Sequence, residues 1–372
     1  MTARNSVGVN LLWLIPGVVG GSEEYTVGLL NAIAGHEHDL ALTLYCQPAL
    51  LRAYPHLGDR YRVETLPVDV ALKPLRFGLE CSWLAMASRR DRLVHHGGGV
   101  LPLGWPRGRS IVTIHDLQPV DLPANFSAGQ RRWFAVMLPR AARTADRLIV
   151  PSEFTANRLI ERFGCEPKRI AVVPPVHQIL SPAEVSEADQ QLINGLGRYV
   201  LYPAVTHRHK RHADALGAFA QLADAYPDLQ LVFTGGQGAA ADEVERQAAD
   251  LGSRVRHLGR VSAPLLDQLI RQAAVLAFPS VYEGFGNPVL EAMARNTPVV
   301  AADATALGPV CGGAALLVEP ESPTALAAGL ASVLDDPERA AELRRLGVAR
   351  AADFGPASAA AALISAYCDT LG

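Results

Sequence analysis

Two glutamates stand at the ends of a glycine-containing stretch, "EGFGNPVLEAM", at residues 283–293. Seven residues separate Glu283 from Glu291, and Gly284 and Gly286 lie between them. Glycine permits positive backbone φ angles and leaves neighbouring N–H groups unshielded by a side chain. A turn of this composition can therefore present several N–H groups to one anion, with a carboxylate on either side.

The flanking residues predict a strand before this turn and a helix after it. The run 273–280 is apolar almost throughout, which is typical of a strand buried in a parallel sheet. Residues 288–295 predict a helix with Asn287 as its N-cap. Because a helix start at the carboxyl end of a parallel strand is an anion site, we predict a bound diphosphate. Glu291 would bind ribose hydroxyls and Glu283 a sugar; alternatively, Glu291 only complements the helix dipole and Glu283 is a solvated turn residue.

A basic loop, "THRHKRH" (206–212), follows a predicted strand at 198–204. Lys210 can neutralise phosphate as a point charge, and an arginine can bind phosphate through two parallel hydrogen bonds. Arg208 and Arg211 are both candidates for that arginine. The alternative is a solvated basic loop that binds no ligand.

Two further candidate positions lie in the first half of the chain. His115 and Asp116 end a predicted strand, where a His–Asp pair can take part in proton transfer or hydrogen bonding. Gly20 and Gly21 lie in a turn before a predicted helix and permit a ligand to approach the backbone closely. The alternative for this turn is a tight bend capped by Ser22.

A competing signal occurs in "FTGGQGAAADEVERQAADLG", where Gly236, Gly238 and Ala241 match a dinucleotide-binding fingerprint. The next predicted strand ends without an acidic residue for a ribose, but Arg260 could meet a 2′-phosphate. An NADP-dependent oxidoreductase is therefore an alternative. It leaves Lys210 without a role, and its fingerprint would follow the second strand of its domain instead of the first.

Composition excludes several classes of protein. The chain has 372 residues, 49% of them hydrophobic, with a formal net charge of −3, so we expect two packed domains and no nucleic-acid partner. Five scattered cysteines without a C-x-x-C pair predict neither a disulfide framework nor a zinc site, but buried apolar residues in a reducing compartment. No run of 18 apolar residues predicts a spanning helix. The short basic segments 88–92 and 106–109 indicate a solvated surface or a small patch for an anionic membrane.

The order of the predicted elements indicates two β/α series joined by a proline-rich linker at 172–197, which includes Pro182. We predict an α/β protein of two Rossmann-like, parallel-sheet domains facing across a cleft. The predicted domains are 1–178, 179–350 and a terminal helix at 351–372 that packs back on the first domain. Strands are predicted at 7–14, 40–46, 92–96, 110–116, 146–152, 198–204, 229–236, 254–259, 273–280, 297–303 and 314–320.

The segment "FPSVYEGFGNPVLEAMARNTPVVAAD" resembles the E-x7-E region of retaining glycosyltransferases of family 4, which have the two-domain GT-B architecture. The resemblance implies that Glu291 holds the donor ribose and that Glu283 contacts the donor sugar. It implies that Lys210, with an arginine such as Arg208, stabilises the diphosphate, and that His115 lies near the reacting centre, with Asp116 orienting it. Further donor-binding residues that it implies are Gly20, Gly21, Gly235, Gly236, Arg260, Val261, Gly284, Phe285, Gly286 and Asn287.

Two segments depart from the family pattern. The chain has "PPVHQI" where relatives usually have Asn-Gly-Val-Asp, and it has Leu307, Gly308 and Pro309 where they often have Leu-Pro-Glu. Neither departure falls in the predicted diphosphate site. Both make it harder to infer the donor of this chain from the donors of its relatives.

The resemblance implies an enzyme that moves a hexose from a nucleotide-diphosphate sugar to a glycan or lipid-linked acceptor, with retention at the anomeric carbon. GDP-mannose is the first expected donor and UDP-glucose the second. No metal or cofactor is expected, and the leaving phosphate is expected to help take the acceptor proton. We expect a cytoplasmic enzyme of surface polysaccharide synthesis that can contact the inner face of the membrane. A non-catalytic sugar-nucleotide-binding protein and an epimerase on the same scaffold are alternatives.

Overall fold

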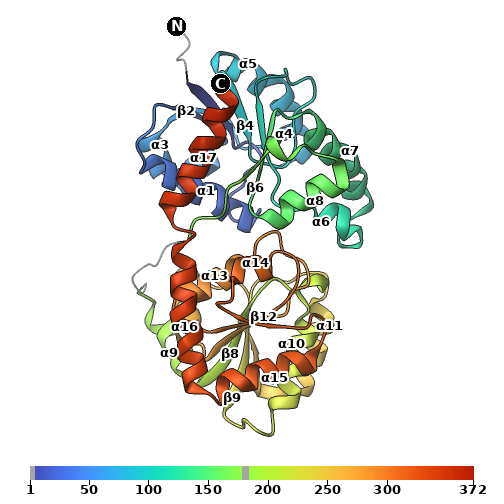
Figure 1. Cartoon of the computed structure of the whole chain (residues 1–372), viewed down its shortest axis with the longest axis vertical. Coiled ribbons are helices and arrows are strands. Elements are labelled where there is room, and N and C mark those ends of the chain that lie inside the picture. Colours follow the sequence, from blue (N-terminus) through green and yellow to red (C-terminus); the bar gives the residue numbers. More distant parts are fainter. Residues whose placement is uncertain (1–4, 178–183) are drawn as a thin grey trace. The chain divides into compact units, whose positions relative to one another are not determined.

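The computed structural model describes residues 5–177 and 184–372, which form two compact units (Figure 1). Unit 1 comprises Met1–Val176 together with Gly355–Gly372, and unit 2 comprises His177–Phe354. The chain thus enters unit 2 once and returns to unit 1 for its last helix. The predicted boundary at 178/179 and Pro182 of the predicted linker lie outside the described residues.

Unit 1 contains a seven-stranded parallel sheet in the order β3-β2-β1-β4-β5-β6-β7. The strand order reverses between β1 and β4, and a reversal of this kind opens a crevice at the carboxyl ends of the strands. The two edge strands, β3 and β7, were not among the predicted strands. The strands are β1 (Ser6–Asn10), β2 (Ala41–Cys46), β3 (Arg62–Thr65), β4 (Leu93–His96), β5 (Ser110–Thr113), β6 (Arg147–Val150) and β7 (Ile170–Val172).

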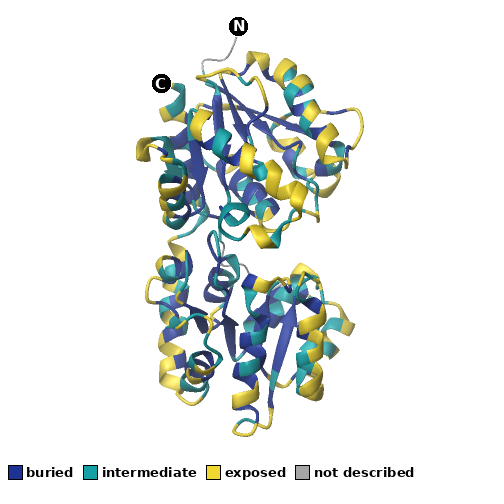
Figure 2. Cartoon of the chain, turned by 90° about the vertical axis from the view of Figure 1, so that its right-hand side faces the viewer, coloured by how far each residue is buried: buried dark blue, intermediate teal, exposed yellow. Residues whose placement is uncertain are grey.

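Helices cover this sheet, and their apolar sides form its core while their outer sides are exposed (Figure 2). The last helix joins the core through Leu363 and Tyr367. The Tyr367 hydroxyl pairs with His95 Nδ1 at 2.8 Å, and His95 Nε2 pairs with Thr113 Oγ1 at 2.6 Å. The α-helices are α1 (Gly21–Ala34), α2 (Pro48–Ala53), α3 (His56–Arg60), α4 (Lys73–Leu79), α5 (Ala85–Ala87), α6 (Gln118–Asp121), α7 (Ala128–Thr144), α8 (Glu153–Phe163) and α17 (Pro356–Leu371).

Unit 2 contains a six-stranded parallel sheet in the order β10-β9-β8-β11-β12-β13, which reverses between β8 and β11. All six strands that the sequence predicts in this half are present, so the predicted α/β class with two parallel sheets is confirmed. The strands are β8 (Arg198–Pro203), β9 (Leu229–Thr234), β10 (Val255–His257), β11 (Val275–Phe278), β12 (Val299–Ala302) and β13 (Leu316–Val318). The helices are α9 (Glu187–Asn194), α10 (His212–Leu222), α11 (Ala241–Asp250), α12 (Ala263–Gln272), α13 (Asn287–Ala294), α14 (Leu307–Cys311), α15 (Pro323–Leu334) and α16 (Pro337–Ala352).

Two predicted helix caps are wrong. Gly20, with φ 64°, caps α1 in place of Ser22, and Gly286, with φ 108°, caps α13 in place of Asn287. In both turns the chain needs a positive φ angle just before the helix, which glycine adopts without steric cost. Both caps leave the first N–H groups of their helices without a side-chain partner from the cap residue.

The cysteines are all free, and three are buried, but Cys81 is partly exposed and Cys368 is exposed. The prediction that every cysteine is buried is therefore wrong for these two. Across 5–177 and 184–372, none of the helices is both long and apolar enough to cross a membrane.

Burial keeps several imidazoles neutral in the folded protein. It lowers the pKa to about 3 for His95 and His96 in unit 1 and for His209 and His212 in unit 2. An unfolded histidine titrates near pH 6.5. Between these two values the unfolded chain binds more protons than the folded one, so the stability that is present above pH 6.5 is lost as the pH falls.

We predict that the unfolding temperature drops steeply between about pH 7.5 and about pH 5, since each buried imidazole costs up to about 1.4 kcal/mol per pH unit below its unfolded pKa. Glu80 opposes this trend because burial raises the pKa of its carboxyl to about 7, but it is one group against several. Glu80→Gln, which cannot take up that proton, should steepen the loss. Calorimetry across this pH range tests both, and an unfolding temperature that stays constant or rises on acidification would contradict the account.

Candidate active site

The candidate donor site lies in unit 2, where the strand order reverses between β8 and β11. The loop after β8 carries Lys210, and the loop after β11 leads to Glu283. The two loops are bonded to each other, since Val281 N donates to the His209 carbonyl at 3.0 Å. The buried Tyr202 hydroxyl donates to the Lys210 carbonyl. Hydrogen bonds thus join the two loops at the carboxyl end of the sheet, although their residues are far apart in the sequence.

Lys210 and Glu283 form an ion pair at this edge, with Nζ and Oε1 2.5 Å apart. The side chains are only 17% and 12% exposed, so water screens the pair less than it would a surface pair. Lys210 Nζ also lies 5.6 Å from the centre of the Phe278 ring. The Glu283 N–H donates to Thr305 Oγ1 at 3.0 Å, and this hydrogen bond holds the backbone of Glu283 in place. The structure therefore brings together the predicted phosphate-binding cation and the predicted sugar-binding carboxylate.

His209, which precedes Lys210, cannot supply a second positive charge at neutral pH. Burial, and then the charge of Lys210, lower the pKa of its imidazole to about 3. Its ring lies beside that of His207, with the ring centres 5.7 Å apart. The residue beside Lys210 is therefore a neutral ring.

The neighbouring arginines differ in what they contact. Arg211 donates two hydrogen bonds to the buried Asp214, at 2.8 and 2.9 Å, and also pairs with Glu321 at 3.5 Å. Arg208 is exposed, and its guanidinium forms no hydrogen bond or ion pair with any described residue. Of the two candidates that the sequence leaves open, Arg208 is the one available to a ligand.

The turn before α13 requires glycine at position 286 for two reasons. Its φ angle is 108°, and a Cβ placed there would lie 2.6 Å from Leu307 Cδ2. Leu307 belongs to the segment that departs from the family pattern, and it packs beneath the turn. The preceding residue, Phe285, is buried and packs edge-on against Phe354, with the ring centres 5.4 Å apart. Gly284 and Asn287 on this turn are partly buried.

Glu291 lies in α13, on the helix that begins directly after this turn. Its side chain is partly buried, and its backbone carbonyl accepts a hydrogen bond from Arg295 Nη1 at 3.1 Å. Arg295 in turn donates to Asp267 at 2.6 Å, which anchors the end of the helix. Its predicted contact with a donor ribose stays a prediction.

The turn that matches a dinucleotide fingerprint packs against the loop after β8. Gly238 N donates to Thr206 Oγ1 at 2.7 Å, and a Cβ on Gly238 would lie 2.7 Å from the Thr206 carbonyl group. Gly235, with φ 125°, donates to the Gly259 carbonyl at 2.8 Å, and a Cβ there would meet Ala204. The glycines at 235 and 238 are therefore needed for loop packing, and the Gly238 N–H is already used.

Three more predicted donor-binding positions lie on this turn or in the loop after β10. A Cβ on Gly236 would meet nothing within 4 Å, so the space beside its Cα is open, while its carbonyl accepts a hydrogen bond from Thr206 N at 3.2 Å. Arg260 is exposed and Val261 is partly buried, in the loop after β10. The loops after β8, β9 and β10 follow adjacent strands, so these residues share an edge with Lys210.

The candidate site in unit 1 centres on His115, after β5. Its Nε2 donates to the Gly97 carbonyl at 3.0 Å, and its ring packs against Tyr25 and Trp13, with centres 5.2 and 5.9 Å away. Burial lowers its pKa to about 4, so the ring is neutral at neutral pH. Because Nε2 carries the proton, Nδ1 is left as an acceptor. Trp13 and Gly97 lie in the loops after β1 and β4, where the strand order of this sheet reverses, and Tyr25 lies in α1.

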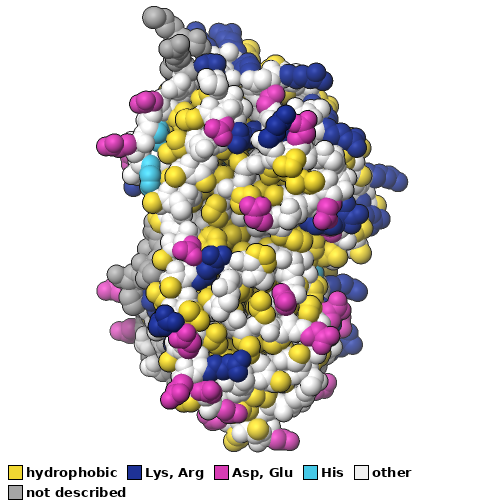
Figure 3. Space-filling view, in the orientation of Figure 1, with side chains coloured by type: hydrophobic (Ala, Val, Ile, Leu, Met, Phe, Trp, Pro, Cys, Tyr) yellow, Lys and Arg dark blue, Asp and Glu magenta, His cyan; other side chains and the backbone are white. Residues whose placement is uncertain are grey.

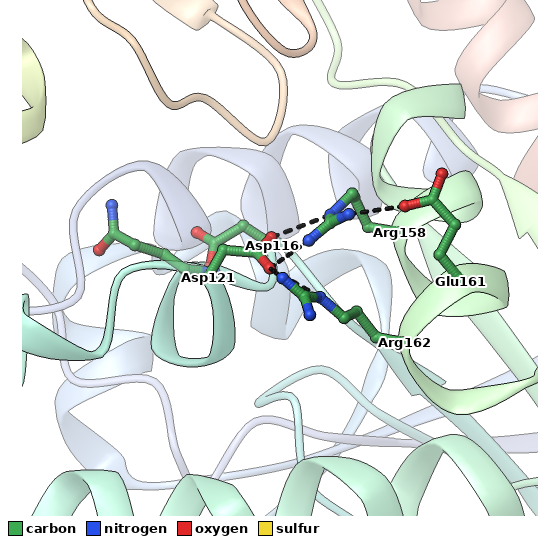
Figure 4. Close-up of polar contacts among 6 residues, drawn as sticks. Asp116, Asp121, Arg158, Glu161 and Arg162 are labelled. Carbon is green, nitrogen blue, oxygen red and sulfur yellow. Dashed lines mark hydrogen bonds and ion pairs between the residues drawn. The ribbon is translucent and has the colours of Figure 1, made fainter.

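Asp116 shapes the loop that follows His115. Its Oδ1 accepts a hydrogen bond from Gln118 N at 2.9 Å, at the start of α6. At the end of α6, Asp121 is held by two arginines of α8 (Figure 4). Arg158 Nε lies 3.0 Å from Asp121 Oδ2, and Arg162 Nη2 lies 3.0 Å from Oδ1. The hydrogen bond between His115 and the Gly97 carbonyl was not predicted from the sequence, although the glycines in "HHGGG" after a predicted strand were a possible signal.

The glycine turn before α1 is supported by Glu23, whose side chain is buried. Its carboxylate accepts hydrogen bonds from Gly17 N and from the Tyr54 hydroxyl, both at 2.8 Å. The carboxylate is thus occupied within unit 1. Gly20 and Gly21 are exposed.

Two parallel α/β sheets, each with candidate residues where its strand order reverses, form the architecture of GT-B glycosyltransferases. Family profiles agree: "Glycosyltransferase Family 4" matches residues 19–176, and "Glycosyl transferases group 1" matches residues 186–348. The chain belongs to glycosyltransferase family 4. It is therefore a glycosyltransferase, and the oxidoreductase alternative is set aside.

Individual relatives and a solved structure agree with this assignment. The chain is 29% identical over 328 residues to O-antigen chain mannosyltransferase B of Escherichia coli, covering 86% of this chain and 82% of that protein. It is 30% identical over 298 residues to the MMP alpha-(1->4)-mannosyltransferase of Mycolicibacterium hassiacum, covering 74% and 69%. Its fold is similar to that of Anabaena HepE, solved in complex with UDP and glucose, with a TM-score of 0.73 at 20% identity over 98% of this chain and 100% of that one.

We predict that Gly286→Ala destabilises unit 2 by about 1–3 kcal/mol, because the new methyl group strains a positive-φ backbone and displaces Leu307. Gly236→Ala is the matched control, since its added methyl group would enter open space in the same unit. Differential scanning calorimetry should show a lowered unfolding temperature for the first variant and little change for the second. Equal unfolding temperatures for Gly286→Ala and the unchanged protein would refute the constraint.

Proposed function

We propose that this protein is a retaining hexosyltransferase whose donor is a nucleotide-diphosphate sugar and whose acceptor is a hydroxyl of a glycan or lipid-linked glycan. The observation that carries the proposal is the Lys210–Glu283 ion pair beside the start of α13, where the strand order of unit 2 reverses. A cation and the N–H groups of Gly286 and Asn287 suit a diphosphate, and a nearby carboxylate suits sugar hydroxyls.

We propose mannose as the sugar and GDP-mannose as the donor. The support is that two relatives covering most of the chain are named mannosyltransferases. UDP-glucose is the second candidate, because Anabaena HepE, of similar fold, was solved in complex with UDP and glucose. Surface polysaccharide synthesis is the proposed setting, and an O-antigen chain enzyme among the relatives supports it.

Donor binding would change the partner of Lys210. In the ligand-free protein its ammonium group is neutralised by Glu283. A diphosphate carries more negative charge than one carboxylate and competes for the ammonium group. Glu283 would then be free to accept hydrogen bonds from hydroxyls of the donor sugar. The ion pair thus keeps both side chains in place before the donor arrives.

The difficult step is departure of the diphosphate, which gains negative charge as the bond to the anomeric carbon breaks. Lys210, Arg208 and the N–H groups at the start of α13 would stabilise that charge. The acceptor oxygen bonds to the anomeric carbon on the face that the phosphate leaves, and the acceptor proton passes to the leaving phosphate oxygen. The configuration is thereby retained. This scheme uses protein cations in place of a metal, and no cofactor enters it.

His115 would act through a hydrogen bond and not as a strong base. Its ring is neutral, and Nδ1 remains an acceptor for a hydroxyl group.

We place the reaction in the cytoplasm, with peripheral contact to the inner face of the membrane where the acceptor is lipid-linked.

We predict that Lys210→Ala lowers kcat with the preferred donor by about two to three orders of magnitude, because a leaving-group contact is lost. Glu283→Gln, which keeps the shape of the side chain, should also lower kcat. Glu342→Gln, in the exposed Arg345–Glu342 pair of α16, removes a similar ion pair elsewhere in unit 2 and should leave kcat unchanged.

Product release is measured with a panel of GDP-, UDP- and dTDP-sugars, and proton NMR of the product reports the anomeric configuration. Wild-type turnover in Lys210→Ala would contradict the proposed role, and inversion would contradict the proposed stereochemistry. Donor binding without transfer would indicate a non-catalytic protein, and release of an altered sugar would indicate an epimerase.

A further inference from the structure

A second basic site lies in unit 1, at the end of the sheet where the strands begin, whereas His115 lies at the end where they finish. Arg92 directly precedes β4 and Arg109 directly precedes β5, whereas His115 follows β5. In a parallel sheet these arginines lie at the amino-terminal edge, roughly 13 Å from the carboxyl edge for strands of this length. The site is therefore separate from the candidate residues described above.

The site is a pocket of about 440 Å³, within the size range of small-molecule sites. Four arginines line it, at 89, 90, 92 and 109, together with Asp91, Gly108 and the last residues of α17. Figure 1 marks the end of the chain at the same end of unit 1 as α5, and Figure 3 shows Lys and Arg side chains at that end. The lining is strongly positive although the whole chain has a net charge of −3.

The acidic residue of the lining feels the charge of Arg109 but forms no ion pair with these arginines in the described parts of the chain. The Asp91 side chain is buried, and its Oδ2 accepts a hydrogen bond from the Tyr45 hydroxyl at 2.7 Å. The same oxygen lies 2.6 Å from the point where a Cβ on Gly8 would be, so it faces the core beside β1. One oxygen of this carboxylate is thus bonded on the core side, away from the arginine side chains.

Two of the arginines are held by the protein and two are not. Arg109 Nη2 donates to the Ser88 carbonyl at 2.9 Å and to the Asp91 carbonyl at 2.5 Å, and Arg92 Nη2 donates to the Leu371 carbonyl at 3.2 Å. Arg89 and Arg90 are exposed, and their guanidinium groups bond to nothing within the described parts of the chain. Capping the end of α17 explains Arg92, but it does not explain the other two.

We propose that this pocket binds a phosphate group. Guanidinium groups present paired N–H donors that match phosphate oxygens, and several of them around one cavity favour a multiply charged anion. The phosphate can belong to an anionic lipid headgroup or to a soluble phosphate compound. A lipid headgroup would hold unit 1 on a membrane by its amino-terminal sheet edge. The proposal does not depend on the donor or acceptor of the enzyme.

The test compares Arg89→Gln/Arg90→Gln with Arg132→Gln/Arg143→Gln in the full chain. The control pair removes the same charge from exposed positions of α7, also in unit 1. One arm measures co-sedimentation with phosphatidylcholine vesicles that contain or lack phosphatidylglycerol. The other arm titrates inorganic phosphate by calorimetry. Neither arm needs a sugar donor, so the result is independent of transferase activity.

We expect the first variant to bind about tenfold more weakly than the unchanged protein, and the control variant to bind normally. Loss of vesicle binding, with no binding of inorganic phosphate to any variant, assigns the pocket to a lipid headgroup. Loss of saturable phosphate binding assigns it to soluble phosphate. Equal weakening by both double variants, or no binding in either arm, would overturn the proposal.

Discussion

The contact between the Lys210 ammonium group and the Glu283 carboxylate is the interaction on which the candidate site of unit 2 depends. It joins the loops that follow β8 and β11, the two strands between which the sheet reverses direction. Helices after such strands leave on opposite faces, so a crevice opens between their loops. The pair is mostly shielded from water, and additional hydrogen bonds hold the backbone on both sides. One ion pair thus fixes the position of two chemically different groups before any ligand is present.

Charge at this edge is controlled by burial as much as by residue type. His209 lies beside Lys210 but stays neutral because it is desolvated and next to a cation. Arg211 is neutralised by Asp214 and Glu321. Groups that can face an anion here include the Lys210 ammonium group, the exposed Arg208 and the helix start at Asn287. The separate arginine cluster at the amino-terminal edge of unit 1 follows the same logic, because its one carboxylate is bonded inside the core.

The sequence predicted the elements whose side chains follow a strong pattern. The buried strands of both sheets are continuously apolar, and Lys210 and Glu283 stand in loops with glycine or basic composition. The edge strand β3 (Arg62–Thr65) was missed because three of its four residues are polar and none is fully buried, and β7 has only three residues. Contacts between residues far apart in the chain also could not be predicted from the sequence. Nothing local indicates that Glu23 bonds to Gly17 and Tyr54 or that Leu307 forces glycine at position 286, and the glycines at 97–99 do not by themselves identify His115 as the partner of Gly97.

The central claim is that the edge formed by Lys210, Glu283 and the start of α13 holds the donor diphosphate. A crystal structure with a bound nucleotide-diphosphate sugar tests it most directly. The account predicts phosphate oxygens within hydrogen-bonding distance of Lys210 Nζ and of the N–H groups at Gly286 and Asn287, with Glu283 released from Lys210 and bonded to sugar hydroxyls. A diphosphate bound instead at the turn from Gly236 to Ala241, with the Lys210–Glu283 pair intact, would contradict it.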